Sequence, residues 1–253
     1  MDLGLKDRVY IVTGGTRGLG RAGAEALVAD GARLVLASRS QESVDAAVND
    51  LGVGSVVGVA ADNADPETPE RLADVALDRF GRLDGALVSV GGPPAGPARE
   101  LTDDQWRAAF ESVFLGAVRL ARVVAARLSG GGALAFVLSS SVKAPISGLA
   151  ASNGLRPGLA MVIKQLADEL GPDGVRTIGL LPGSIETDRL RELAEMSGRD
   201  PDAVKETASR TIPLRRYGRP EEFGKVAAFV LSPAASYLTG SMIAVDGGSI
   251  RSL

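Results

Sequence analysis

The sequence predicts a single α/β domain of Rossmann type, in which a doubly wound, mainly parallel seven-stranded sheet carries helices on both faces. Short β-branched apolar runs alternate with longer helical segments along all 253 residues. The runs are apolar throughout, which indicates strands covered on both faces, as in parallel sheets. A glycine-rich turn at residues 13–20 joins the first strand to the first helix, and such turns hold dinucleotides.

The first strand, residues 9–12, runs into this turn and then into an alanine-rich helix. Gly14 allows the tight turn, Gly18 has no side chain to hold a diphosphate away, and Gly20 lets the helix pack close to the strand. The free N–H groups and positive dipole end of the helix form an anion site. A plain glycine-rich surface turn is the alternative, but the position between strand and helix favours a dinucleotide site.

The remaining elements follow in chain order. We expect strands at residues 33–37, 56–60, 85–90, 134–138, 175–181 and 242–245, and helices at 42–51, 66–79, 102–128, 152–170 and 221–231. Thr102 and two acids begin the first long helix, and Pro220 begins the last helix. The polar stretch 184–212 predicts a mobile substrate lid or a short helical pair within the single domain, residues 1–253.

Polar or glycine-rich turns recur at the carboxyl ends of the expected strands, where such sheets bind ligands. Arg39 follows Ser38 at the place where an NAD site carries an acidic residue. Together with Arg17 it favours a 2′-phosphate, so we expect NADP(H) as cofactor, with NAD(H) less favoured. Each feature has a plainer interpretation: both arginines as surface charges, Asp62 as a turn former, and residues 139–141 as a strand cap.

Composition narrows the chemistry. The net charge is −3 and the basic residues are dispersed, so we expect no nucleic-acid partner and no binding to acidic membranes. The chain has neither cysteine nor histidine, which excludes disulfides and thiol chemistry and leads us to expect no metal site. Proton transfer is left to Tyr, Lys, Ser or carboxylates. Without a signal-like start or an apolar run of about 18 residues, we expect a soluble, cytoplasmic protein.

These residues resemble the short-chain dehydrogenase/reductase family over essentially the whole chain. Residues 13–20 look like its cofactor motif, Asp62 like its adenine contact, 182–187 like its nicotinamide-side loop, and 218–222 with 245–248 like its C-terminal signature. The resemblance implies NAD(P) as cofactor and the reduction of a carbonyl or oxidation of an alcohol on a small-molecule substrate. The expected cofactor-binding residues are Gly14, Thr16, Arg17, Gly18, Leu19, Gly20, Ser38, Arg39, Asp62, Asn63, Gly91, Gly92, Arg156, Pro182, Gly183, Ile185 and Thr187.

The resemblance also implies a homotetramer or homodimer, assembled through the two long helices and the last strand. Both long helices carry more apolar residues than one buried stripe requires, which suggests a partner surface. The surplus residues are Val113, Phe114, Val118, Leu159, Met161 and Val162.

The catalytic positions depart from the family pattern, which has Tyr-x-x-x-Lys at the start of the second long helix. Matching residues 164–170 to that helix puts Ser152 at the tyrosine and Arg156 at the lysine. Val113 falls at the family's asparagine, and residues 90–92 replace its usual Asn-Ala-Gly. The family's serine is retained, as Ser139 by spacing or as Ser141 if the loop is two residues shorter.

A serine hydroxyl is several pKa units less acidic than a tyrosine at about 10, so Ser152 cannot replace the tyrosine unaided. Arg156 keeps its charge and can hydrogen-bond the nicotinamide ribose. Lys143 is either a proton donor with a pKa lowered by burial or a solvated loop lysine. The sequence thus predicts an NADP(H)-dependent, 3-oxoacyl-reductase-like oxidoreductase with the altered catalytic set Ser139, Ser152 and Arg156, or else a non-catalytic NADP(H)-binding sensor or assembly subunit.

Overall fold

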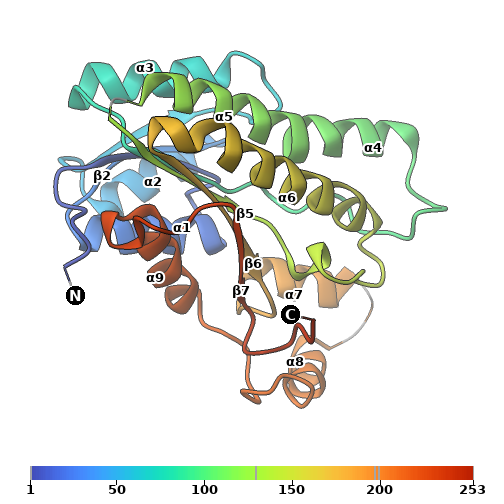
Figure 1. The fold of residues 1–253 in the computed structure, drawn as a ribbon. Helices are drawn as coiled ribbons and strands as arrows, with labels where there is room; N and C mark the ends of the chain where they lie inside the picture. The colour runs from blue at the N-terminus through green and yellow to red at the C-terminus, as the bar shows by residue number, and fades with distance from the viewer. Residues whose placement is uncertain (1, 129, 197, 199, 253) are drawn as a thin grey trace.

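The described residues form one sheet of seven parallel strands (Figure 1). This computed structural model describes residues 2–128, 130–196, 198 and 200–252. The strand order β3-β2-β1-β4-β5-β6-β7 reverses between β1 and β4, and sheets of this kind bind ligands in a crevice outside the carboxyl ends of the strands at that point. The strands are β1 (Val9–Thr13), β2 (Arg33–Ser38), β3 (Val56–Ala60), β4 (Gly85–Val88), β5 (Gly132–Val137), β6 (Val175–Pro182) and β7 (Ser241–Val245).

Helices cover both faces of this sheet, as the doubly wound prediction requires (Figure 1). The helices are α1 (Gly18–Ala29), α2 (Gln41–Leu51), α3 (Thr68–Phe80), α4 (Asp103–Ala109), α5 (Gly116–Arg127), α6 (Ala150–Leu170), α7 (Asp188–Met196), α8 (Pro201–Ser209) and α9 (Pro220–Leu231). Leu72, Leu120 and Ile163 of α3, α5 and α6 share one core. Leu27 and Phe223 of α1 and α9 belong to the core on the opposite face.

Strand β1 shows why the apolar runs have no polar alternation. Val9 and Ile11 point into the α3, α5 and α6 core, whereas Tyr10 and Val12 point into the α1 and α9 core. All four are almost fully buried. Burial of an aliphatic side chain such as Val or Ile stabilises a fold by about 1.5–3 kcal/mol. A central strand of this kind must be apolar at every position, so the prediction of a two-faced sheet is confirmed.

The first long helix differs from the sequence prediction. Residues 102–128 form α4, then a π-helical segment, Phe110–Leu115, and then α5. The capping box at Thr102 is present, with Gln105 as its partner. Gly116, just after the π-helical segment, lies so close to the Asn63 carbonyl that a Cβ there would overlap it. Hydrophobic periodicity does not reveal one extra residue in a turn, so the break was not predicted.

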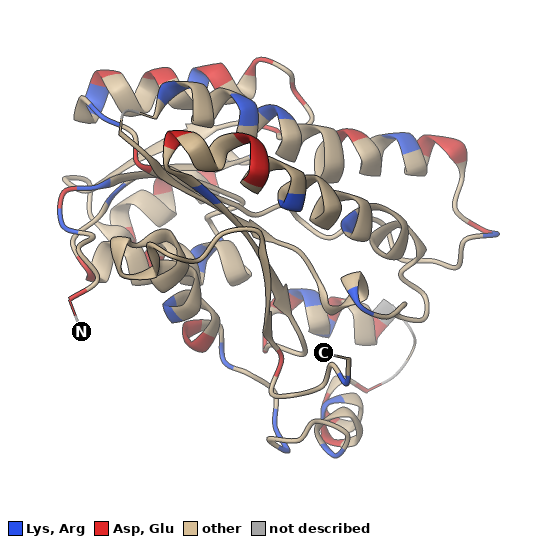
Figure 2. Ribbon diagram, in the orientation of Figure 1, with Lys and Arg blue, Asp and Glu red and all other residues tan. Residues whose placement is uncertain are grey.

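The polar stretch 184–212 forms α7 and α8, the helical-pair version of the prediction. Asp200 caps α8 by accepting a hydrogen bond from the Asp202 N–H. Figure 2 shows both basic and acidic residues on the helices of the domain. Among the helices that the structure describes, none combines the length and the apolar character needed to cross a bilayer.

Candidate active site

The turn between β1 and α1 has the geometry that its glycines predict. Gly14 and Gly18 adopt left-handed φ angles of +56° and +57°, which glycine accepts without strain. A Cβ on Gly14 would lie 2.7 Å from the Ser89 carbonyl oxygen, and one on Gly20 would overlap the Gly14 carbonyl. Around Gly18 the space is open, and a Cβ there would lie 3.9 Å from the Thr187 Cγ2 atom. The turn therefore leaves bare backbone for a ligand at Gly18 while packing tightly at Gly14 and Gly20.

The N-terminus of α1 is free of side-chain caps. Its N-cap residue, Arg17, makes no capping hydrogen bond, and the first turn holds no acidic residue. Its N–H groups and dipole are therefore available to an anion such as a diphosphate. Leu19 packs against the core and contributes only backbone here.

The two arginines expected at a 2′-phosphate lie at this end of the crevice. Arg39 is exposed directly after β2, and the Thr16 hydroxyl donates to Ser38 Oγ at 3.1 Å, tying the glycine turn to that strand end. Arg17 is 66% exposed and forms an ion pair with Glu192 of α7 at 3.1 Å.

Asp62 and Asn63 follow β3 at the same edge of the sheet. The Asp62 carboxylate accepts a hydrogen bond from the Ala64 N–H at 2.9 Å, which is the turn-forming role given as its plainer interpretation. Its side chain is also exposed. Asn63 donates to the hydroxyl of Thr13 at 3.5 Å, so it borders the glycine turn.

The loop after β6 lies opposite the glycine turn. Thr187 approaches Gly18, as described above, and a Cβ on Gly183 would press on Asp246 at 2.7 Å. Pro182 pairs with Val245 of β7. Ile185 is buried at 3% exposure, so its side chain belongs to the core. The structure thus brings the segments 14–20 and 182–187 together, as their predicted roles require.

A pair of serine hydroxyls lies at the end of β5. Ser141 Oγ and Ser152 Oγ are 3.2 Å apart and both residues are buried. Ser139 Oγ instead accepts from the Ser141 N–H at 3.1 Å and caps the short 3-10 turn Ser140–Val142. The sequence left open whether Ser139 or Ser141 is the family's serine. The structure brings Ser141 to Ser152, whereas Ser139 caps the turn at the end of the strand.

Arg156 lies one helical turn beyond Ser152 and is only 7% exposed. Its Nη1 atom donates to the Val137 carbonyl oxygen at 2.7 Å, and the structure shows no carboxylate paired with it within the described part of the chain. Burial, with a smaller contribution from the charge of Arg189, lowers the pKa of Arg156 to about 10. The guanidinium therefore stays charged at neutral pH in a poorly hydrated place.

Within the part of the chain that the structure describes, none of the three tyrosines forms a hydrogen bond with this pair of serines. Tyr10 donates to the Leu231 carbonyl at 3.2 Å, and burial raises its pKa. Burial likewise raises the pKa of Tyr217, and Tyr237 is fully exposed. Lys143 is exposed in the turn after β5, so the burial that a lysine proton donor requires is missing. In the residues the structure covers, no cluster of acidic, histidine or cysteine side chains suits a metal ion.

Arg189 was not among the residues predicted from the sequence. It extends from α7 across the crevice, where its Nη2 atom donates to the Pro93 carbonyl at 3.0 Å. A Cβ on Gly92 would lie 2.8 Å from its Nε atom, so the glycine makes room for the guanidinium. The sequence showed only a charged lid stretch, and nothing in it indicated which of its arginines turns inward.

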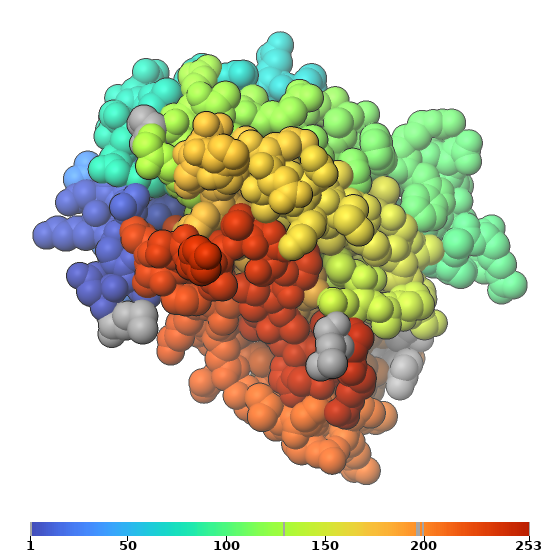
Figure 3. Space-filling view, viewed as in Figure 1, coloured from blue at the N-terminus to red at the C-terminus, as the bar shows by residue number. Residues whose placement is uncertain are grey.

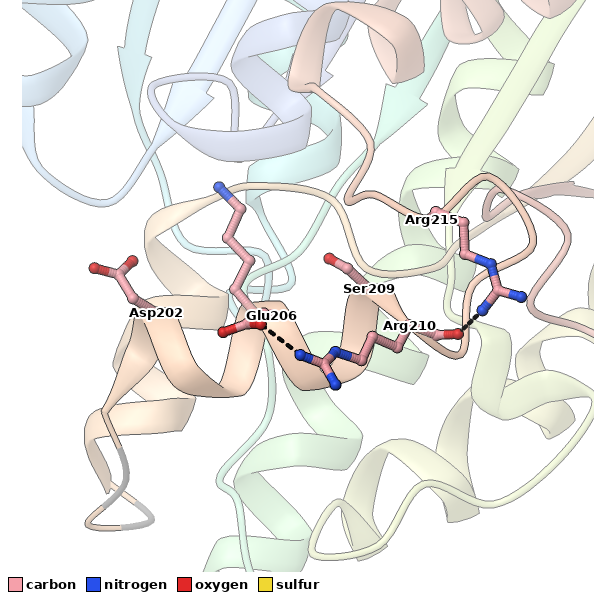
Figure 4. A pocket seen from close by; sticks show the side chains of 6 residues that line it. Asp202, Glu206, Ser209, Arg210 and Arg215 are labelled. Carbon is pink, nitrogen blue, oxygen red and sulfur yellow. Dashed lines mark hydrogen bonds and ion pairs between the residues drawn. The ribbon is translucent and has the colours of Figure 1, made fainter.

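A separate hollow of about 430 Å³ lies between α8 and the loop that carries Arg215 (Figure 4). Arg210 pairs there with Glu206 at 2.6 Å, and Arg215 donates to the Arg210 carbonyl. No residue predicted for cofactor or catalysis lines it. The hollow is bordered by Asp202, Lys205, Glu206, Ser209, Arg210 and Arg215.

Known proteins resemble this chain over nearly its whole length. Residues 14–249 match a family model described as enoyl-(acyl carrier protein) reductase. Dehydrogenase/reductase SDR family member 4 of Caenorhabditis elegans is 34% identical, over 95% of this chain and 94% of its own. L-sorbose reductase of Gluconobacter frateurii, solved with NADPH and L-sorbose, is 30% identical with a TM-score of 0.93 and full coverage of both chains. A 7α-hydroxysteroid dehydrogenase solved with NADH is 25% identical, with a TM-score of 0.90, over 100% of this chain and 98% of that one.

Proposed function

The chain belongs to the short-chain dehydrogenase/reductase family, and from this we propose an NADP(H)-dependent oxidoreductase that acts on a small carbonyl or alcohol, in the manner of a 3-oxoacyl reductase, with an altered catalytic set. The observation that carries the proposal is the arrangement of residues at the carboxyl edge of the sheet. It has an uncapped helix N-terminus at one end and the Ser141, Ser152 and Arg156 cluster at the other. A cytoplasmic location is part of the proposal, since the reaction draws on a cofactor kept inside the cell.

The residues of the crevice fit the cofactor. Because Gly18 and Gly91 have no side chain, the space beside their backbone is open to a ligand. The N–H groups at the N-terminus of α1 can hydrogen-bond the diphosphate. Of the similar solved structures, one was solved with NADPH and another with NADH. The choice between these two cofactors therefore rests on this chain's own residues. Arg17 and Arg39 provide charge for a 2′-phosphate, and no carboxylate stands at Ser38 to bind a free ribose hydroxyl.

When bound, the cofactor supplies the hydride, and the protein orients and polarises the substrate. In our proposal Arg156 holds the nicotinamide ribose and stabilises negative charge on the substrate oxygen. The hydroxyls of Ser141 and Ser152 hydrogen-bond that oxygen, and a water held by Ser152 delivers the proton. Ser141 takes the role for which Ser139 was predicted, because Ser139 is committed to the turn.

A broad screen of carbonyl substrates with NADPH tests the proposal. Consumption of NADPH with at least one small carbonyl is the expected result. NADPH binding without turnover of any carbonyl would favour the second candidate, a non-catalytic sensor or assembly subunit. Among the described residues, no tyrosine hydrogen-bonds the Ser141 and Ser152 pair. This observation favours the second candidate.

We expect NADPH to bind more tightly than NADH, by roughly 1.5–3 kcal/mol, because Arg17 and Arg39 can form charge-assisted hydrogen bonds with the 2′-phosphate. Calorimetric titration of both cofactors measures the difference. The Arg39→Asp substitution should remove most of this difference in binding free energy between NADPH and NADH. Arg79→Asp, the same charge change at an exposed site on α3, should leave it in place. Equal affinities in the unaltered protein would contradict the assignment.

We also propose a homotetramer or homodimer. Met161 of α6 is 71% exposed and Phe110 is 41% exposed, and α6 lies at the surface in Figure 3. Val113 and Leu159, which the sequence pattern had added to this surplus, are buried in the chain's own core. The partner surface we propose is therefore smaller than the sequence suggested.

Light scattering should give a mass well above the 26.0 kDa of one chain, since exposed apolar side chains on a helix favour association. Met161→Glu should shift the mass toward the monomer. Val53→Glu offers the matched control, because Val53 is 69% exposed in a turn outside the two long helices. A monomeric unaltered protein at micromolar concentration would refute the assembly.

A further inference from the structure

Two arginines extend toward the substrate end of the crevice. Arg156 comes from α6 beneath it and Arg189 from α7 across it. The positive charge of Arg189 adds to burial in lowering the pKa of Arg156. Like charges brought together repel, so the arrangement is unfavourable unless an anion joins them.

Neither charge is fully compensated by the residues that the structure describes. The hydrogen bond of Arg156 goes to a neutral backbone carbonyl, that of Val137. Arg189 also bonds a carbonyl, and its nearest carboxylate oxygen, from Glu192, is 3.7 Å away. Glu192 lies closer to Arg17, at 3.1 Å, so one carboxylate is shared between two arginines. A buried, unpaired charge costs several kcal/mol.

The cofactor proposed above would not neutralise these charges. Its 2′-phosphate is assigned to Arg17 and Arg39 at the β2 end of the crevice, and its diphosphate to the N-terminus of α1. The ribose hydroxyls near Arg156 carry no charge. A negative charge on the substrate would compensate these two positive charges.

We propose that the site takes a small oxo acid, whose carboxylate is bound by Arg189 while its carbonyl oxygen meets Arg156 and the Ser141 and Ser152 hydroxyls. This inference rests on the proposed oxidoreductase function. Arginine binds a carboxylate through parallel N–H donors, and Arg189, with its side chain 35% exposed, remains accessible to a ligand. Gly92 is part of the arrangement, because a side chain there would displace the guanidinium of Arg189.

The reaction balances as an ordinary reduction. A hydride from NADPH forms a C–H bond at the carbonyl carbon, the C=O π electrons move to oxygen, and that oxygen takes a proton from water. The products are a hydroxy acid and NADP⁺. The carboxylate is unchanged throughout, so it serves for binding and orientation.

Binding can be tested apart from turnover. Malonate, a dicarboxylate without a ketone, should bind the NADPH-loaded protein in calorimetry, whereas dimethyl malonate should bind at least tenfold more weakly. Arg189→Gln should weaken malonate binding about tenfold or more and leave NADPH affinity unchanged. The control is Arg191→Gln, an exposed arginine on the same helix, which should change neither.

Turnover gives a second readout. Acetoacetate and pyruvate should be reduced with a kcat/KM at least tenfold above that of their methyl esters, and Arg189→Gln should lower the value for the acids only. Equal binding of malonate and its ester, or equal turnover of acids and esters, would overturn the inference. Failure to bind NADPH would instead defeat the proposed function, and malonate titrated without NADPH would still report on the two arginines.

Discussion

Replacing Ser152 by tyrosine and Arg156 by lysine together should raise the turnover of a simple 3-oxoacyl ester, by up to about 10²- to 10⁴-fold, the usual contribution of a general acid. Both positions face the end of β5, where Ser152 meets Ser141 and Arg156 meets the Val137 carbonyl. A phenol beside an ammonium group can exchange a proton near neutral pH, whereas the serine hydroxyl cannot. Steady-state kinetics with NADPH measure the gain.

The single substitutions serve as controls for this gain. Each should raise turnover less than the pair does. The phenol needs the ammonium group to lower its pKa, and without the phenol the ammonium group has no acidic partner whose proton transfer it can assist. Val113→Asn should add to the effect of the pair. Ordinary family rates in the unaltered protein would refute the hypothesis, since they would require another acid. Arg156→Ala with unchanged NADPH affinity and turnover would show that the helix register is wrong.

The second large effect is expected at Gly20. A methyl group there would overlap the backbone carbonyl of Gly14, which cannot move aside as a flexible side chain could. Gly20→Ala should destabilise the fold by about 2–3 kcal/mol, which corresponds to a fall in Tm of roughly 5–10 °C for a chain of this size. NADPH binding should fall with it, because the turn that carries the N–H groups must shift. Thermal unfolding and calorimetry measure the two effects.

Gly91→Ala is the matched control for stability. It adds the same methyl group to another predicted cofactor-binding glycine, where no heavy atom lies within 4 Å of the new Cβ. Its free energy of unfolding should change by less than about 0.5 kcal/mol. An equally small effect of Gly20→Ala would show that helix α1 can move away from the strand, contrary to the tight packing described above.

Much of the fold could be predicted because strands buried on both faces leave an unmistakable pattern. The run 9–12 is apolar at each position since alternate side chains enter opposite cores. The π-helical segment Phe110–Leu115 could not be predicted, because Val113 is its one buried residue among those described and gives no spacing that would reveal an extra residue in the turn.

The candidate site was predictable where backbone chemistry dictates the residue type. Gly14 and Gly20 are required by the close approach of backbone atoms, which no other residue type permits. The choice between Ser139 and Ser141 stayed open, because counting residues cannot show that a 3-10 turn brings the later serine to Ser152. Arg189 was missed since its role depends on how α7 folds back over Gly92, which is a matter of tertiary structure.

The ion pair between Arg17 and Glu192 has a thermodynamic consequence. It ties the middle of α7 to the glycine turn, so a cofactor phosphate that engages Arg17 must take it from Glu192 and release the helix from the turn. Both side chains are well exposed, and such a pair contributes up to about 1 kcal/mol. The affinities of cofactor and substrate are then linked by at most about fivefold, and equally in both directions. Each ligand should therefore change the affinity of the other by the same small factor, whichever of them binds first.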